Sequence, residues 1–201
     1  MNLADIPKEK LSPMMQQYAA TKEKYNDCIL FFRLGDFYEM FFEDAILVSR
    51  ELELTLTGKE CGLEERAPMC GVPYHSVELY LKRLDKGYKI AICEQMTDPA
   101  LSKGLVERDV IRIVTPGTLI ESSMLDDDSN NYICTLYYGN DGSCALCFAD
   151  LSTGEMSLTI PQEASDLSVR IMDVLSRYMP AELVMNSQAL SLKSVMDFIK
   201  V

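Results

Sequence analysis

The residues with the clearest potential for chemistry lie between Phe31 and Phe42, in the string Phe-Phe-Arg-Leu-Gly-Asp-Phe-Tyr-Glu-Met-Phe-Phe. This run holds five phenylalanines and one tyrosine in a chain that has no tryptophan. An exposed aromatic ring can stack on a nucleobase, and a nearby carboxylate can accept a hydrogen bond from a base or, when protonated, donate one. The alternative is that Phe37 belongs to an ordinary hydrophobic core and that Glu39 is a solvated charge at a strand end.

The Gly35-Asp36 pair divides this run into two extended segments. Residues 28–34 are apolar enough to predict a buried strand, and the pair itself is a turn or bulge signal. If the chain continues as a strand, its side chains alternate between the two faces of the sheet. One face would then carry Phe37, Glu39 and Phe41, and the other Tyr38, Met40 and Phe42.

Hydrophobic spacing predicts alternating helices and strands along the first 118 residues. Helices are expected to begin at Ser12-Pro13 and at Ser76, where a capping residue precedes helically spaced apolar residues, and to span residues 45–52. Further strands are predicted at residues 54–57, 68–72, 88–93 and 106–114, and a loop at residues 58–67. The alternation predicts an α/β domain built on a mixed sheet flanked by helices.

Composition and charge change near residue 118. Residues 1–118 contain 15 basic and 19 acidic side chains, and residues 119–201 contain 4 basic and 12 acidic ones. The polar run Asp126–Asn131 follows this change, so we expect a linker at residues 119–130 and a second domain at 131–201. Strands at 132–138, 143–151 and 155–160, a helix from Leu167 to before Pro180 and a strand at 182–185 predict the first half of a ribonuclease-H-like α/β sheet.

Several classes of protein are disfavoured by composition. A formal charge of −12 argues against strong binding of nucleic acid by this chain alone, because phosphate contacts come mainly from clustered Lys and Arg. No apolar run approaches the length of a membrane span, and no signal peptide precedes the first helix, which predicts a cytoplasmic protein. Seven cysteines without a regular spacing predict reduced thiols rather than disulfides or a zinc site.

These motifs resemble those of the bacterial MutS family, the mismatch sensors of DNA repair. Residues 35–39 are similar to the Phe-x-Glu signature of that family. Further similar strings occur in the same order at residues 13–18, 68–75, 91–95, 106–108 and 113–118. The resemblance implies a mismatch-recognition domain at residues 1–118 and a truncated, ribonuclease-H-like connector domain at residues 131–201.

The resemblance also implies roles for individual residues. Phe37 would enter the duplex as a wedge and stack on the mispaired base, and Glu39 would form a hydrogen bond to that base. Unstacking a mispaired base costs less than unstacking a paired one, and an aromatic wedge kinks the duplex from the minor groove. The neighbouring positions that would approach the groove are Leu34, Asp36, Lys59 and Met69. The Gly58-Lys59-Glu60 stretch is less basic than its family counterpart, which argues against strong contact of this loop with the DNA backbone.

The resemblance implies mismatched duplex DNA as the ligand, a homodimer for the full-length protein, and docking of repair proteins on the acidic connector domain. The chain has no Gly-x-x-x-x-Gly-Lys-Ser/Thr loop, so we expect neither catalysis nor the ATP and Mg²⁺ of the full-length family protein within it. For His75, capping or packing is expected rather than acid–base chemistry.

Two alternatives remain open. One is a metal-dependent nuclease built on the ribonuclease-H-like second domain, which would use Asp150 at a strand end. Two-metal hydrolysis requires several converging carboxylates. No such cluster is predicted by the spacing of four further acidic residues in the second domain, Glu155, Asp166, Asp173 and Glu182. The second alternative is a protein-interaction module without catalytic activity.

Overall fold

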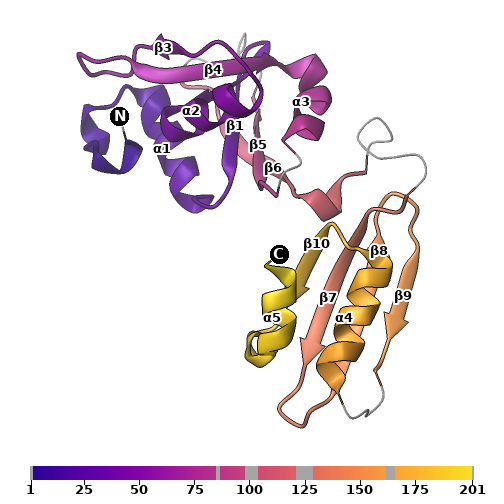
Figure 1. The fold of residues 1–201 in the computed structure, drawn as a ribbon. Helices are drawn as coiled ribbons and strands as arrows, with labels where there is room; N and C mark the ends of the chain where they lie inside the picture. The colour runs from indigo at the N-terminus through magenta and orange to yellow at the C-terminus, as the bar shows by residue number, and fades with distance from the viewer. Residues whose placement is uncertain (1, 85–86, 98–103, 121–128, 162–165, 201) are drawn as a thin grey trace. The chain divides into compact units, whose positions relative to one another are not determined.

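The computed structural model describes residues 2–84, 87–97, 104–120, 129–161 and 166–200 (Figure 1). The chain divides into two compact units, Met1–Thr115 and Pro116–Val201. Most of the predicted linker, residues 121–128, lies outside the described residues, as do residues 98–103. The domain boundaries at residues 118 and 131 therefore stay predictions.

The first unit is built on a six-stranded mixed sheet with the order β3-β4-β2-β1-β5-β6. Only the β1–β5 pair is parallel, and all other neighbouring strands run antiparallel. The strands are β1 (Ile29–Leu34), β2 (Phe37–Phe41), β3 (Thr57–Lys59), β4 (Ala67–Pro73), β5 (Ile90–Gln95) and β6 (Arg108–Val114). This arrangement confirms the predicted mixed sheet.

Three helices accompany this sheet: α1 (Pro13–Lys24), α2 (Phe42–Glu51) and α3 (Val77–Arg83). Short 3₁₀ turns occur at Leu3–Asp5, Lys8–Lys10 and Tyr74–Ser76. Pro13 lies in the first turn of α1, where its missing N–H costs no hydrogen bond. Ser76 precedes α3, but its hydroxyl donates to the carbonyl of Pro73 at 3.3 Å instead of capping the helix. The predicted capping role of Ser76 is therefore wrong.

The core between α1 and the sheet centres on Tyr18. Its ring meets Phe32 and Phe41 edge-on, with centroids 5.4 and 5.0 Å away, and lies 6.2 Å from Phe42. Phe42 was expected on the face opposite Phe41, and this prediction is wrong. The backbone of Phe42 has a φ of +53°, so the chain leaves the strand at this residue and both rings enter the same core.

The predicted strand at residues 54–57 and loop at 58–67 also need correction. Strand β3 begins only at Thr57 and includes Gly58 and Lys59. Lys59 pairs with Ala67 and Thr57 with Met69. Pairing with β4 therefore outweighs the local preference of Gly58 for a turn, as tertiary context often does for strands.

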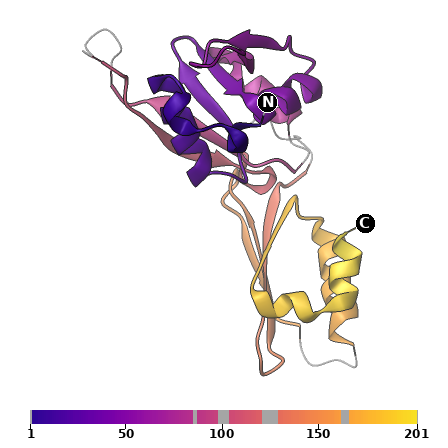
Figure 2. The same ribbon diagram turned by 90° about the vertical axis from the view of Figure 1, so that its left-hand side faces the viewer.

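The second unit has a four-stranded sheet with the order β10-β7-β8-β9. Strands β7 (Tyr132–Tyr138), β8 (Cys144–Asp150) and β9 (Met156–Thr159) are antiparallel, whereas β10 (Glu182–Met185) runs parallel to β7. Helices α4 (Leu167–Tyr178) and α5 (Lys193–Ile199) lie on one face of this sheet (Figures 1 and 2). This topology confirms the predicted first half of a ribonuclease-H-like sheet.

Local signals explain the limits of α4. The Asp166 side chain accepts a hydrogen bond from the Val169 backbone N–H at 3.2 Å and so caps the first turn. The helix ends at Tyr178, and the next residue, Met179, adopts a left-handed φ of +43° immediately before Pro180. Among the described residues, no helix is both long and apolar enough to cross a membrane.

Candidate nucleic-acid interface

The hairpin between β1 and β2 brings the residues that could act on a base to one face of the first sheet. Leu34 pairs with Phe37 and Phe32 pairs with Glu39, and directly opposed residues in an antiparallel pair share a face. Gly35 at the turn has a φ of +59°, a conformation that glycine adopts without steric cost. The turn therefore fixes the parity that was predicted for Phe37, Glu39 and Phe41.

Phe37 lies at the exposed end of this face. Its side chain is 46% exposed, whereas Phe41, four residues along the same strand, is fully buried against Tyr18. A large exposed phenylalanine next to a tight turn does not contribute to the core as the other rings of the run do. Its exposure leaves the ring available for contact with a ligand.

Glu39 forms an ion pair that spans three strands. Its Oε2 atom lies 2.6 Å from Nζ of Lys59, although β4 separates their strands. The Glu39 side chain is 15% exposed and that of Lys59 33% exposed, so the pair is partly shielded from water. Glu39 is therefore not the solvated strand-end charge of the alternative interpretation.

The position opposite Glu39 on β4 is Gly71. A Cβ atom at Gly71 would lie 3.2 Å from the carbonyl oxygen of Tyr38 and 3.5 Å from Cγ of Glu39. The absence of a side chain at Gly71 thus gives the Glu39 side chain room to extend over β4.

The other predicted site residues lie close to this face. Leu34 is half-buried opposite Phe37, and Met69 is half-buried opposite Phe41. Asp36 lies in the turn, where its carbonyl accepts a hydrogen bond from the backbone N–H of Tyr74 at 2.9 Å. The structure thus brings five of the six predicted residues to one face and places Asp36 at its margin.

A second cluster, not predicted from the sequence, supports the hairpin from the opposite face. The Arg33 guanidinium lies 3.2 Å from Glu94 and 3.6 Å from the ring centroid of Tyr74. The Tyr38 hydroxyl donates to the same Glu94 carboxylate, and burial together with this carboxylate raises the pKa of Tyr38. In the sequence, Arg33 and Tyr38 alternate with the residues of the candidate face, which indicates that they lie on the other face. That pattern did not identify Glu94 as their partner.

A buried carboxylate connects the candidate face to the helices. Asp44 on α2 accepts hydrogen bonds from Lys22 Nζ and the Leu30 N–H, both at 2.9 Å, and from the Tyr18 hydroxyl at 3.3 Å. Burial raises the pKa of Asp44, and these donors oppose the shift. Tyr18 in turn packs on Phe41, so the network fixes the buried end of β2.

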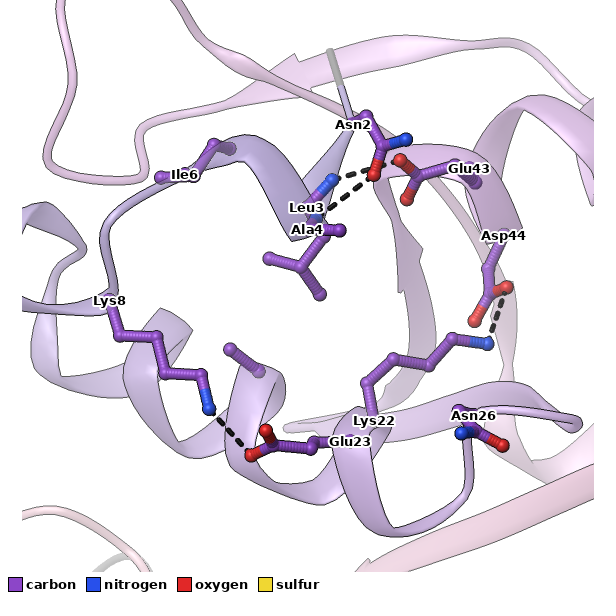
Figure 3. Close-up of a pocket in the computed structure, with 11 residues that line it drawn as sticks. Asn2, Leu3, Ala4, Ile6, Lys8, Lys22, Glu23, Asn26, Glu43 and Asp44 are labelled. Carbon is purple, nitrogen blue, oxygen red and sulfur yellow. Dashed lines mark hydrogen bonds and ion pairs between the residues drawn. The ribbon is translucent and has the colours of Figure 1, made fainter.

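The Lys22–Asp44 pair also borders a pocket of about 560 Å³ between the N-terminal residues, α1 and α2 (Figure 3). Figure 3 shows Leu3, Ala4 and Ile6 on one side of it and the Lys8–Glu23 ion pair at another edge. None of the six predicted site residues lines this pocket.

Asp150, the residue on which a nuclease would depend, is engaged in local hydrogen bonds. Its Oδ1 accepts from the Ser152 N–H and hydroxyl and from the Thr153 N–H, and its Oδ2 accepts from the Asn131 N–H. Desolvation raises the pKa of Asp150, but these hydrogen bonds outweigh it and the net pKa is lowered. Within the described ranges, no group of three or more His, Cys, Asp or Glu residues is arranged to hold a metal ion.

Comparison with known proteins places both units in one family. Residues 12–123 match the family model for MutS domain I, and residues 131–200 match that for MutS domain II. The DNA mismatch repair protein MutS of Acetivibrio thermocellus is 58% identical over 179 residues, which make up 89% of this chain and 20% of that protein. The proteins of the same name from Clostridium tetani and Ruminiclostridium cellulolyticum are 58% and 54% identical, over 88% and 89% of this chain and 20% of each relative.

The chain thus spans about a fifth of the length of the curated relatives that it matches. The domain I match alone covers more than half of the chain. The motifs around Phe37 and the topology of both sheets agree with these matches, and the chain belongs to the MutS family.

Proposed function

We propose that this chain recognises mispaired or unpaired bases in duplex DNA, with Phe37 as the stacking wedge and Glu39 as the hydrogen-bonding partner of the displaced base. The observation that carries the proposal is the exposure of Phe37 on the same face as Glu39, in a strand whose other phenylalanine is buried. The names of the similar proteins, all DNA mismatch repair proteins, support the same ligand.

The selectivity of such a site derives from the DNA. Separating a mispaired base from its neighbour costs less than separating a paired one, because the mispaired base is less well stacked and paired. Stacking of the Phe37 ring would replace the lost base contacts, a contribution of about 1 to 3 kcal/mol. Glu39 adds to the difference, because a displaced base offers a hydrogen-bond partner that a paired base does not readily expose.

Catalysis is not part of this proposal. The Asp150 carboxylate already accepts hydrogen bonds from the turn that follows β8, and no other observation on the described residues favours hydrolysis. The acidic second unit would repel phosphates, which fits a protein-docking role better than a nuclease role.

The test compares the dissociation constants for a matched duplex and for the same duplex with one G·T mismatch. Fluorescence anisotropy at low salt suits the weak binding expected of a chain with a formal charge of −12. We expect Phe37→Ala to lower the preference for the mismatch by about fivefold or more, which corresponds to the lower limit of one stacking interaction. Phe37→Trp keeps an aromatic ring and should retain the preference.

An unchanged preference in Phe37→Ala would contradict the wedge role. Equal affinity of the unmodified chain for the two duplexes would contradict the proposed function as a whole.

A further inference from the structure

The ion pair between Lys59 and Glu39 crosses the candidate face and engages only part of each group. Glu39 uses Oε2 for the contact of 2.6 Å, and no other described residue donates to its Oε1. Lys59 Nζ lies 5.9 Å from the ring centroid of Phe41, and its side chain is 33% exposed. An ammonium group has three donor hydrogens. Lys59 therefore retains N–H groups that can donate hydrogen bonds to water or to a second anion.

The location of Lys59 allows it to change partners. It is the last residue of β3, a three-residue strand at the edge of the sheet, whereas Glu39 lies in the interior strand β2. A long side chain at the end of an edge strand can turn toward solvent without disturbing the sheet, but Glu39, with 15% exposure, cannot lose its partner without leaving a partly buried charge unpaired.

We propose that Lys59 is a specificity-determining residue that moves from Glu39 to a DNA phosphate, and that this exchange is favourable only on a mispaired duplex. The inference rests on the proposed function of Glu39. On a matched duplex, the base offers Glu39 no donor, so release of Lys59 would leave the carboxylate unpaired beside the phosphates. On a mispaired duplex, the base replaces Lys59 as the partner of Glu39, and Lys59 then contributes one additional phosphate contact.

The exchange has a signature that an ordinary phosphate-binding lysine lacks. Such a lysine contributes equally to matched and mismatched binding, so its loss weakens both and lowers the salt dependence of both. The exchange predicts instead that the unmodified chain has a steeper salt dependence on the mismatched duplex, by about 0.9 in log Kd per log salt concentration. A fourfold increase in salt would therefore weaken mismatch binding about 3.5-fold more than matched binding.

Two substitutions should abolish this difference for opposite reasons. Lys59→Met removes the mobile cation, so the mismatched duplex should fall to the lower salt dependence of the matched one. Glu39→Gln frees Lys59 on both duplexes, so the matched duplex should rise to the higher salt dependence. Lys24→Met, which removes an exposed lysine near the end of α1, is the matched control and should leave the difference between the duplexes intact.

The experiment measures both duplexes at several KCl concentrations for the unmodified chain and the three variants, after circular dichroism has shown that each variant is folded. Lys59→Gln replaces Lys59→Met if the latter is unfolded. A Lys59→Met variant that weakens both duplexes equally, while the unmodified chain still prefers the mismatch, would overturn the exchange and leave the proposed function standing. Absence of any mismatch preference in the unmodified chain would overturn the proposed function itself.

Discussion

Phe37 and Phe41 project from β2 on the same face, yet Phe37 is 46% exposed and Phe41 is completely buried. Phe41 is buried because α1 packs on it. Tyr18 of that helix meets the Phe41 ring edge-on at 5.0 Å, and the ring contacts that Tyr18 makes are with Phe32, Phe41 and Phe42. One strand thus presents a core ring and an accessible ring four residues apart.

The two rings should differ sharply in their contribution to stability. We expect Phe41→Ala to lower the free energy of unfolding by about 3 to 5 kcal/mol, as for other buried phenylalanines. Phe37→Ala should cost less than about 1 kcal/mol, because much of the ring is already in water. Urea denaturation of both variants measures the difference. An equal loss of unfolding free energy in the two variants would indicate that Phe37 is a core residue.

Glu39→Ala should strengthen binding to matched DNA while it reduces discrimination. The substitution removes a negative charge from the DNA-facing surface and releases Lys59 from its contact of 2.6 Å. The measurement is the pair of dissociation constants for matched and mismatched duplexes at one salt concentration. Glu9→Ala, which removes an exposed charge elsewhere, serves as the control and should leave the ratio unchanged. Weaker binding of matched DNA by Glu39→Ala would count against the assigned role of this carboxylate.

The buried pair of Lys22 and Asp44 should show strong energetic coupling. Removing one partner leaves the other partly buried without its counter-charge, which typically costs about 3 to 5 kcal/mol. We therefore expect Asp44→Asn and Lys22→Met each to destabilise the first unit, and the double variant to cost clearly less than the sum. A double-mutant cycle of unfolding free energies tests this, and simple additivity would argue that the 2.9 Å contact contributes little.

Asp150 should make the second unit sensitive to acid. Its pKa in the folded protein is lowered by hydrogen bonds from Ser152, Asn131 and Thr153, which outweigh desolvation. The stabilisation is therefore complete above the unfolded-state pKa of about 3.9 and is lost as the pH falls through the lower folded-state value. Asp150→Asn should be less stable near neutral pH by about 1 to 3 kcal/mol and should lose less stability in acid. Unfolding curves at several pH values would show this, and parallel pH profiles of the two proteins would contradict it.

No cleavage of DNA or RNA is expected with Mg²⁺ or Mn²⁺. Both oxygens of Asp150 already accept hydrogen bonds within the turn after β8, and the described residues provide no acidic cluster around it. Incubation with labelled duplex and single-stranded substrates, resolved on denaturing gels, is sufficient as an assay. Metal-dependent cleavage that disappears in Asp150→Asn would favour the nuclease alternative.

Local sequence rules accounted for most of the strands and side-chain directions, with β3 and the direction of Phe42 as exceptions. The two-residue period placed Phe37 and Glu39 on one face, and the strands predicted at residues 132–138, 143–151 and 155–160 correspond to β7, β8 and β9. These features depend on neighbours within a few residues, which a single sequence displays directly.

Features that depend on distant pairing could not be predicted in the same way. The strand character of Lys59 comes from Ala67, and its contact with Glu39 reaches across an intervening strand. Likewise, Glu94 lies 61 residues from Arg33 in the chain. Such contacts follow from the register of the assembled sheet, which no local pattern specifies.

The placement of Lys59 on a short edge strand has an evolutionary consequence. Residues at the end of an edge strand carry few backbone and packing constraints, so substitutions there are tolerated far more readily than in the interior strand that holds Glu39. Selection could therefore change how strongly this face prefers mismatched DNA by substituting Lys59, while Phe37 and Glu39 stay unchanged. Divergence within the lineage would then accumulate at position 59 before it reached positions 37 and 39.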